Sequence, residues 1–181
     1  YWGKDFEKGG ITVSGGEPLL QMEFVTELFK LAKEKGVHTA LDTSGQPFKK
    51  EESFLSKFNE LMKYTDLVLL DIKAYDNDLH KDITGCANDN ILEMAEYLSD
   101  CGKSMWIRRV LVSGLTDGES ELEATADFIA SLKTVERIEV LPYHTLGLMK
   151  WEKLNIEYPL KGYRAPTDEA VSKAKLILGA D

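Results

Sequence analysis

Five short runs of strand-forming residues recur at nearly even intervals along the chain, and this spacing constrains the fold more than any other feature of the sequence. The runs are Ile11–Ser14, Thr39–Thr43, Leu67–Lys73, Met105–Val112 and Ile138–His144, and their first residues lie between 28 and 38 positions apart. Intervals of this length leave room for a helix between successive strands. Strands joined through helices lie parallel in right-handed βαβ units. The sequence therefore predicts an α/β fold with one parallel sheet.

The segments between these runs carry the periodicity of amphipathic helices. Leu20, Phe24, Leu28 and Ala32 recur at helical spacing, so we predict that they form the buried face of a helix that Gly36 ends. Further helices are predicted over 91–98, ending at Cys101-Gly102, over 122–132, with Thr116 and Glu119 spaced as a capping box, and after Thr167. No linker interrupts the pattern, so we expect one domain over residues 1–181. The expected architecture is an open doubly wound sheet or a partial (β/α) barrel, because a complete TIM barrel needs eight βα units and the sequence shows five strand runs.

The overall charge and composition argue against several classes of protein. The chain has 181 residues and a net charge of −9, which argues against partners that are nucleic acids or anionic membrane surfaces. No apolar run approaches the roughly 18 residues that a membrane-spanning helix needs. The two cysteines, Cys86 and Cys101, fit no metal-binding spacing and indicate a reducing compartment, so we expect a cytoplasmic protein.

The first residues of the chain are unlike a native start. The sequence begins Tyr1-Trp2-Gly3-Lys4, without an initiator Met and without the basic and apolar regions of a signal peptide. We therefore expect that the chain is part of a longer polypeptide.

Ionisable side chains stand at or near the carboxyl ends of the predicted strands. They are Glu17, Asp42, Asp71, Lys73, Arg108 and His144, and the first strand runs into Gly15-Gly16. In parallel α/β folds, ligands bind at this edge of the sheet. Each feature alone is also typical of a plain turn, a helix cap or a solvated strand end. Their occurrence on successive strands favours a functional site.

The alternation of side chains along a strand places several of these residues on one face. Asp71 and Lys73 share a face of the third strand, and the same count puts Asp42, Arg108 and His144 on the inner side. Two carboxylates about 5 Å apart repel by roughly 3 kcal/mol at an effective dielectric constant of about 20. We therefore expect a positive group between Asp42 and Asp71: Lys73, Arg108, a cation or the ammonium group of a ligand.

Several segments together resemble the motifs of one enzyme family. Residues 14–18 read SGGEP, 38–45 read HTALDTSG, 66–73 read DLVLLDIK, 106–114 read WIRRVLVSG and 141–151 read LPYHTLGLMKW. In this order they resemble the motifs of glycyl-radical-enzyme activases, which belong to the radical S-adenosylmethionine superfamily. The Gly-Gly-Glu motif alone is moderately specific. Together the segments cover most of the chain and are very specific for the pyruvate formate-lyase activase branch.

The resemblance implies a role for each matching residue. Gly15, Gly16 and Glu17 would contact the methionine end of S-adenosylmethionine, Asp71, Ile72 and Lys73 would line this cofactor, and His144 would contact its adenosyl part. Arg108 would stand where the substrate glycine enters and is the implied catalytic residue. Asp42, Thr43, Asp71 and the carbonyl of Leu69 match a monovalent-cation site of the family.

The resemblance also implies a reaction and its partners. In this family a reduced [4Fe–4S] cluster cleaves S-adenosylmethionine, and the resulting 5′-deoxyadenosyl radical abstracts hydrogen from a backbone glycine of a glycyl radical enzyme, here pyruvate formate-lyase. An electron donor such as flavodoxin or ferredoxin reduces the cluster. The family's CxxxCxxC motif is missing from this chain, and neither Cys86 nor Cys101 can replace it. The resemblance thus implies strands two to six of a six-stranded partial barrel, without the first βα unit, and an inactive fragment.

Three alternatives stay open at the level of sequence. The chain resembles activases in general, so its partner could be another glycyl radical enzyme, such as a dehydratase or a decarboxylase. Lys73 could instead form a Schiff base in an aldolase-like lyase, although Asp71 on the same face would keep this lysine protonated. The third alternative is a non-catalytic barrel fragment that binds a partner protein.

Overall fold

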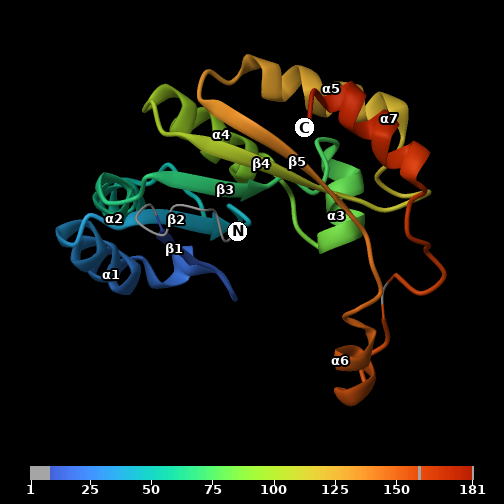
Figure 1. Cartoon of the computed structure of the whole chain (residues 1–181), viewed down its shortest axis with the longest axis horizontal. Coiled ribbons are helices and arrows are strands. Elements are labelled where there is room, and N and C mark those ends of the chain that lie inside the picture. Colours follow the sequence, from blue (N-terminus) through green and yellow to red (C-terminus); the bar gives the residue numbers. More distant parts are fainter. Residues whose placement is uncertain (1–8, 159, 181) are drawn as a thin grey trace.

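The five strands form a single parallel sheet in which neighbours follow chain order. In the computed structural model of the protein, which describes residues 9–158 and 160–180, each strand pairs in parallel with the next. The strands are β1 (Gly10–Val13), β2 (His38–Thr43), β3 (Leu67–Asp71), β4 (Met105–Leu111) and β5 (Val135–Pro142). They run from blue β1 to orange β5 in Figure 1. The α/β fold and the parallel sheet are confirmed.

Seven helices and one short 3₁₀ turn accompany the strands in the described residues. They are η2 (Pro18–Gln21), α1 (Met22–Glu34), α2 (Glu52–Lys63), α3 (Asn77–Thr84), α4 (Asp89–Asp100), α5 (Glu119–Ser131), α6 (Leu148–Lys153) and α7 (Asp168–Leu178). None of these helices is both long and apolar enough to cross a bilayer. The short α6 lies apart from the sheet, at the bottom of Figure 1.

The main core lies between one face of the sheet and the helices α1, α2, α4 and α5. Each layer contributes large apolar side chains: Phe29 from α1, Phe58 from α2, Met94 from α4, Ile129 from α5, and Leu41, Leu70 and Ile107 from the strands. These helices cover the same face, which favours the partial barrel over a doubly wound sheet with helices on both faces. The opposite face of β2, β3 and β4 carries Asp42, Asp71 and Arg108.

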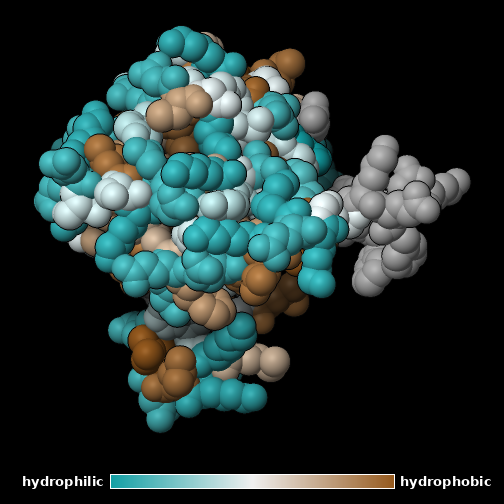
Figure 2. All heavy atoms as spheres, turned by 90° about the vertical axis from the view of Figure 1, so that its left-hand side faces the viewer, coloured by the Kyte–Doolittle hydropathy of each residue, from teal (hydrophilic) through white to brown (hydrophobic). Residues whose placement is uncertain are grey.

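The buried face of α1 agrees only in part with the predicted one: Ala32 is buried and Leu28 packs against the core, but the other two residues do not. Leu20 and Phe24 were expected to be buried, but their exposed fractions are 74% and 65%. Met22, Val25 and Phe29 face the core in their place. The η2 turn precedes the helix and leaves Leu20 outside it, so the helix starts at Met22 and a different stripe meets the sheet. Hydrophobic side chains are accordingly visible among polar ones on this side of the molecule (Figure 2).

One predicted helix end is confirmed and one predicted cap is wrong. Gly36 follows the end of α1 with a φ of +69°, a left-handed conformation that glycine adopts without strain. The capping box at Thr116 and Glu119 does not form, because the residue before α5 is Gly118, which has no side chain to cap with. The hydroxyl of Thr116 instead accepts from the Val112 N–H at 2.8 Å and donates to the Val110 carbonyl at 2.9 Å.

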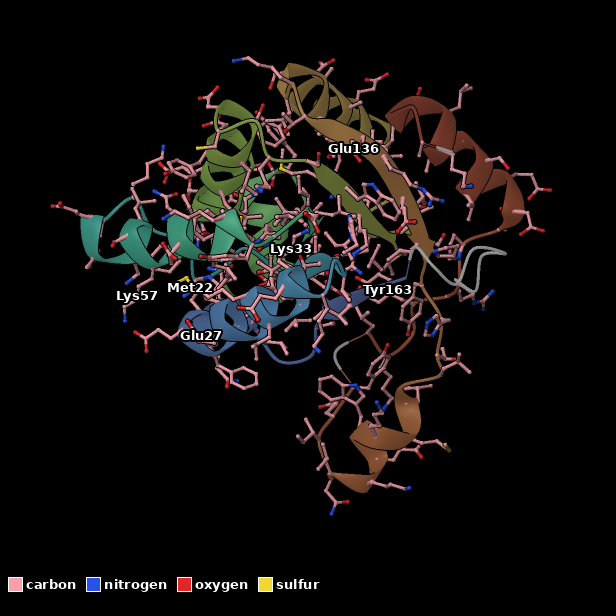
Figure 3. The ribbon with its side chains drawn as sticks, turned by 60° about the vertical axis from the view of Figure 1, so that its left-hand side comes forward. Met22, Glu27, Lys33, Lys57, Glu136 and Tyr163 are labelled. Carbon is pink, nitrogen blue, oxygen red and sulfur yellow. The ribbon has the colours of Figure 1, made fainter. Side chains whose placement is uncertain are left out.

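Charged side chains join the helices of the helical layer to one another and to the sheet. Figure 3 shows α1 and α2 side by side, with Lys57 of α2 near Met22 and Glu27 of α1. Lys33, also in α1, donates to the carboxylate of Asp66 at 2.7 Å, and the same carboxylate accepts from the Thr39 N–H at 2.8 Å. Burial tends to raise the pKa of Asp66, but the hydrogen bonds from Lys33 and Thr39 outweigh burial and lower it below the usual value of 3.8.

Asp66→Asn is expected to lower the free energy of unfolding at pH 7 by about 1 kcal/mol, since one charge-assisted hydrogen bond is lost. A carboxyl group with a lowered pKa stabilises the fold above its usual pKa and loses this contribution as the pH falls further. The difference between wild type and variant should therefore shrink below about pH 4. Urea unfolding at pH 7 and pH 3 measures both values. Asp100→Asn, which removes an exposed partner of Lys133, is the control, and an equal loss at both pH values would contradict the assignment.

Candidate active site

The loop after β1 contains two glycines in a conformation that other residues avoid. Gly15 and Gly16 have φ values of +84° and +60°. A Cβ atom added at either position would meet no atom within 4 Å. The glycines are therefore required by the backbone conformation and not by crowding, and the space beside them is open to a ligand. Such a turn lets main-chain groups approach a bound molecule closely.

The Glu17 carboxylate holds this loop against the end of β2. It accepts from the Thr43 hydroxyl at 2.6 Å, from the Ser44 hydroxyl at 2.6 Å and from the Ser44 and Leu19 N–H groups at 3.0 Å. Thr43 is buried and its hydroxyl also accepts from the Gly45 N–H. Four donors surround one carboxylate, so the geometry gives Glu17 a structural task beside its predicted contact with the cofactor.

Four of the predicted site residues meet in one cluster, which we call the Arg108 cluster: Asp42, Asp71, Lys73 and Arg108. The Arg108 guanidinium donates through Nε to Asp71 at 2.9 Å and through Nη1 to Asp42 at 3.1 Å, and Nη2 also donates to Asp42. Lys73 Nζ donates to the other oxygen of Asp71 at 2.8 Å. The side chains are 18–31% exposed. The expectation that a positive group separates the two carboxylates is confirmed, and the group is Arg108.

The charges of the Arg108 cluster balance. Burial tends to lower the pKa of Arg108, but the carboxylates of Asp71 and Asp42 outweigh burial and raise the pKa above its usual value. Arg108 and Lys73 engage all four carboxylate oxygens of Asp42 and Asp71. A monovalent cation at these oxygens would share them with Arg108 and Lys73, and the cation site stays a prediction.

Lys73 is poorly placed to be a nucleophile. Its ammonium group is ion-paired with Asp71 at 2.8 Å. Attack on a carbonyl group by the Lys73 nitrogen would require this ion pair to break. The geometry thus argues against the aldolase-like alternative.

The remaining predicted residues lie outside the Arg108 cluster. Ile72 is 1% exposed and its side chain packs in the main core, while its N–H donates to the Arg108 carbonyl at 3.0 Å. Leu69 precedes Asp71 by two positions on the same face of β3. β5 ends at Pro142, so His144 lies beyond the strand, is exposed, and takes part in none of the hydrogen bonds or ion pairs found in residues 9–158 and 160–180. Its contact with the adenosyl group stays a prediction.

The structure adds three residues of the same sheet face that the sequence analysis missed. Trp106 and Arg108 pair across the sheet with Arg137 and Glu139 of β5. The Arg137 guanidinium lies 5.0 Å from the centre of the Trp106 ring and 3.4 Å from Glu139. The alternation of Arg137, Glu139 and Leu141 in the sequence indicates that they share one face of a strand. The predicted strand begins only at Ile138, however, and the sequence does not specify its register with β4.

The described residues do not provide a site for an iron–sulfur cluster. Cys86 and Cys101 are both exposed and unpaired. No group of three or more His, Cys, Asp or Glu side chains in the described residues could hold a metal ion. S-adenosylmethionine fits better, because the open Gly15-Gly16 turn and the cations of the Arg108 cluster lie at the same edge of the sheet and its methionine part carries a carboxylate.

Comparison with known proteins identifies the family of the chain. The profile of the radical SAM superfamily matches residues 2–129. The chain is 52% identical over 178 residues to a pyruvate formate-lyase-activating enzyme of Streptococcus mutans, covering 98% of this chain and 66% of the relative. It is 52% identical over 170 residues to a protein of the same name from Staphylococcus aureus, covering 94% and 68%. The chain thus spans about two thirds of the length of these relatives.

A solved structure shows the same fold at a lower identity. A domain of pyruvate-formate lyase-activating enzyme from Bacteroides vulgatus superposes with a TM-score of 0.76 at 28% identity, covering 94% of this chain and 93% of that chain. SuiB of Streptococcus suis, solved with bound S-adenosylmethionine, shares the fold at 22% identity with a TM-score of 0.63, covering 81% and 35%. The chain belongs to the radical SAM superfamily and, within it, to the pyruvate formate-lyase-activating enzymes.

Proposed function

We propose that the protein to which this chain belongs activates pyruvate formate-lyase by installing a glycyl radical. The observation that carries the proposal is the joint placement of the Gly15-Gly16 turn and the Arg108 cluster at one edge of the sheet. It is supported by the 52% identity to relatives that bear this name. We propose further that residues 1–181 act as one domain in this task and that the protein is cytoplasmic.

Each residue of the site receives a role from its chemistry. The main chain at Gly15 and Gly16 approaches the methionine end of S-adenosylmethionine, and Lys73 pairs with its carboxylate. Arg108 orients the segment of the partner that carries the glycine, which requires it to release one carboxylate. His144 approaches the adenosyl group. S-adenosylmethionine, when bound and reduced by one electron from the cluster, would supply the carbon radical that removes hydrogen from the glycine, while this chain would bind and orient the reactants and exclude water.

The iron–sulfur cluster must be held elsewhere. Three thiolates are needed, and this chain has two cysteines that lie apart in the sequence. We propose that the chain by itself neither assembles the cluster nor cleaves S-adenosylmethionine, and that an electron donor such as flavodoxin or ferredoxin serves the complete protein. We propose in addition a monovalent cation at Asp42, Thr43, Leu69 and Asp71, which would share the carboxylate oxygens with Arg108 and Lys73.

A fusion to the part of the Streptococcus mutans relative that this chain does not cover tests the function. After anaerobic reconstitution with iron and sulfide, the fusion should generate a glycyl radical on pyruvate formate-lyase, detected by electron paramagnetic resonance. Lys73→Ala in the fusion should weaken S-adenosylmethionine binding about tenfold, since one ion pair to the ligand is lost. The cluster absorbance should stay unchanged because Lys73 does not hold iron.

Lys50→Ala is the matched control, because Lys50 is an exposed lysine paired with Glu93 in the helical layer. It should leave the affinity for S-adenosylmethionine unchanged. A fusion that assembles the cluster but forms no glycyl radical on pyruvate formate-lyase would contradict the proposed partner. Loss of the cluster in Lys73→Ala would contradict the role of this lysine.

A further inference from the structure

The second arginine of β4 points to the opposite side of the sheet from Arg108. Arg109 follows Arg108 directly, so the alternation of the strand turns its side chain toward the helical layer. The side chain is fully buried, with an exposed fraction of 0%. A buried guanidinium needs acceptors around it, since an unpaired buried charge is strongly unfavourable.

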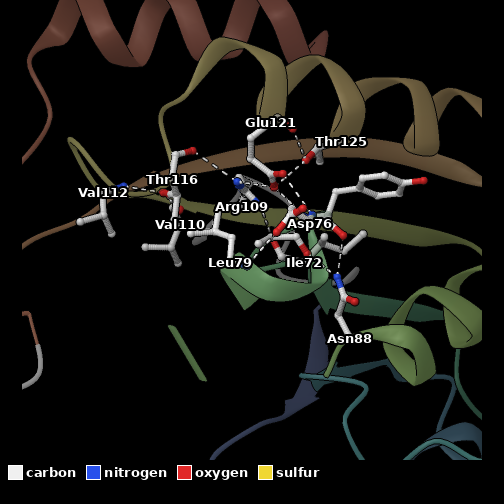
Figure 4. A network of polar contacts seen from close by, with 12 residues as sticks. Ile72, Asp76, Leu79, Asn88, Arg109, Val110, Val112, Thr116, Glu121 and Thr125 are labelled. Carbon is white, nitrogen blue, oxygen red and sulfur yellow. Dashed lines mark hydrogen bonds and ion pairs between the residues drawn. The ribbon is translucent and has the colours of Figure 1, made fainter. Parts of the chain in front are cut away.

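The acceptors of Arg109 come from three separate segments. Its Nη1 donates to the Ile72 carbonyl at 3.4 Å, and its Nη2 donates to the Thr116 carbonyl at 3.3 Å and to Glu121 Oε1 at 3.0 Å (Figure 4). Burial lowers the pKa of Arg109 and Glu121 counteracts this. Arg109 Nε is buried without a hydrogen-bond partner in the described residues. The buried ion pair of Arg109 and Glu121 therefore leaves one polar atom unsatisfied. Its presence in the helical layer is not explained by stability alone.

The Glu121 carboxylate holds the segment that follows β3. Glu121 lies in the first turn of α5 and accepts from the Tyr75 N–H at 2.6 Å and from the Asp76 N–H at 3.1 Å. The buried Asn88 side chain donates to the carbonyls of Ala74 and Tyr75 at 2.9 and 2.8 Å. Residues 72–76 are thus fixed from the helical side at both ends, by Arg109 and by Glu121 with Asn88.

Lys73 stands in the middle of this fixed segment. Because the main chain of residues 72–76 is held from the helical side, the Lys73 side chain extends from a defined position into the Arg108 cluster. We propose that Arg109 and Glu121 form a positioning pair that sets the place of Lys73 for the carboxylate of S-adenosylmethionine. The inference rests on the proposed function, in which Lys73 binds this carboxylate.

Glu121→Gln tests the pair with two measurements, the first in the 181-residue chain and the second in the fusion described above. The first is hydrogen exchange of the Tyr75 and Asp76 amides by NMR, which should become about tenfold faster because one acceptor oxygen is replaced by a donor. The second is the Kd for S-adenosylmethionine, which should rise about tenfold, the step expected for one misplaced hydrogen-bonding group. Both are measured where urea unfolding shows the variant to be fully folded, so that a general loss of stability does not change them.

Glu119→Gln is the matched control. Glu119 lies in the same first turn of α5, but it pairs with Lys173 at the surface and is 60% exposed. This variant removes the same charge from the same helix end and should change neither measurement. Arg109→Met should resemble Glu121→Gln in both measurements. Arg109→Lys, which keeps a cation beside Glu121, should recover most of the affinity.

The outcomes separate this inference from the proposed function. If wild type binds S-adenosylmethionine and Glu121→Gln binds it equally well, the positioning pair is overturned and the proposed function stands. If Arg109→Lys behaves like Arg109→Met, the pairing with Glu121 is not what positions Lys73, and the inference is also overturned. If Lys73→Ala does not weaken binding that Glu121→Gln weakens, Lys73 is not the positioned group and the inference is overturned. If the wild-type fusion assembles the cluster but binds no S-adenosylmethionine, the cofactor role assigned to this site fails, and the inference with it.

Discussion

Arg108→Met is expected to lower the free energy of unfolding by about 3 kcal/mol, near the low end of the cost of removing one partner of a buried ion pair. Without Arg108, the carboxylates of Asp42 and Asp71 face each other at 18% exposure with Lys73 as the remaining cation. The cost therefore arises mainly from uncompensated negative charge and only in part from lost packing. Urea unfolding at pH 7 gives the value.

A second substitution distinguishes the effect of uncompensated negative charge from the effect of lost packing. Asp42→Asn combined with Arg108→Met should be more stable than Arg108→Met alone, because one of the two repelling charges is gone. Arg108→Lys, which keeps the charge but not the fork of donors, should lose about 1 kcal/mol. If the double variant were no more stable than the single one, the charge balance of the Arg108 cluster would not be the reason for the loss.

Glu17→Ala should lower the free energy of unfolding by about 3 kcal/mol, because four donors lose a charged acceptor and hydrogen bonds to charged groups are worth roughly 1.5–3 kcal/mol each without being additive. The buried Thr43 hydroxyl and the Ser44 N–H would be left without this partner. The amide of Ser44 should also exchange faster, because the loop after β1 would no longer be fastened to the end of β2. Urea unfolding and amide exchange by NMR measure the two effects.

Glu23→Gln is the control for the loss of charge. Glu23 lies six residues further along, pairs with Lys57 and is 78% exposed. An exposed ion pair of this kind contributes less than about 1 kcal/mol. A loss in Glu17→Ala no larger than that in Glu23→Gln would show that the loop does not depend on the Glu17 carboxylate.

The sequence determined the topology and the composition of the Arg108 cluster. Strand runs about 30 residues apart, with helical periodicity between them, are typical of βαβ units, so the parallel sheet followed from spacing and periodicity. Side chains alternate between the two faces of a strand, and this alternation depends only on the local backbone. It was therefore sufficient to place Asp71 and Lys73 on the same face of the sheet. The need for a positive group near two carboxylates followed from electrostatics in the same way.

The tertiary structure alone decided which partner each side chain takes. Among four candidates for the positive group, Arg108 was selected by the register that sets Asp71 opposite Arg108, and β-sheet register depends on the whole fold. The burial of Phe29 instead of Phe24 depended on where α1 begins. Arg109 and Glu121 are only 12 positions apart, yet nothing local in the sequence joins them to Tyr75 and Asp76. That contact exists because α5 packs beside the end of β3, and such long-range packing leaves no periodic trace in the sequence.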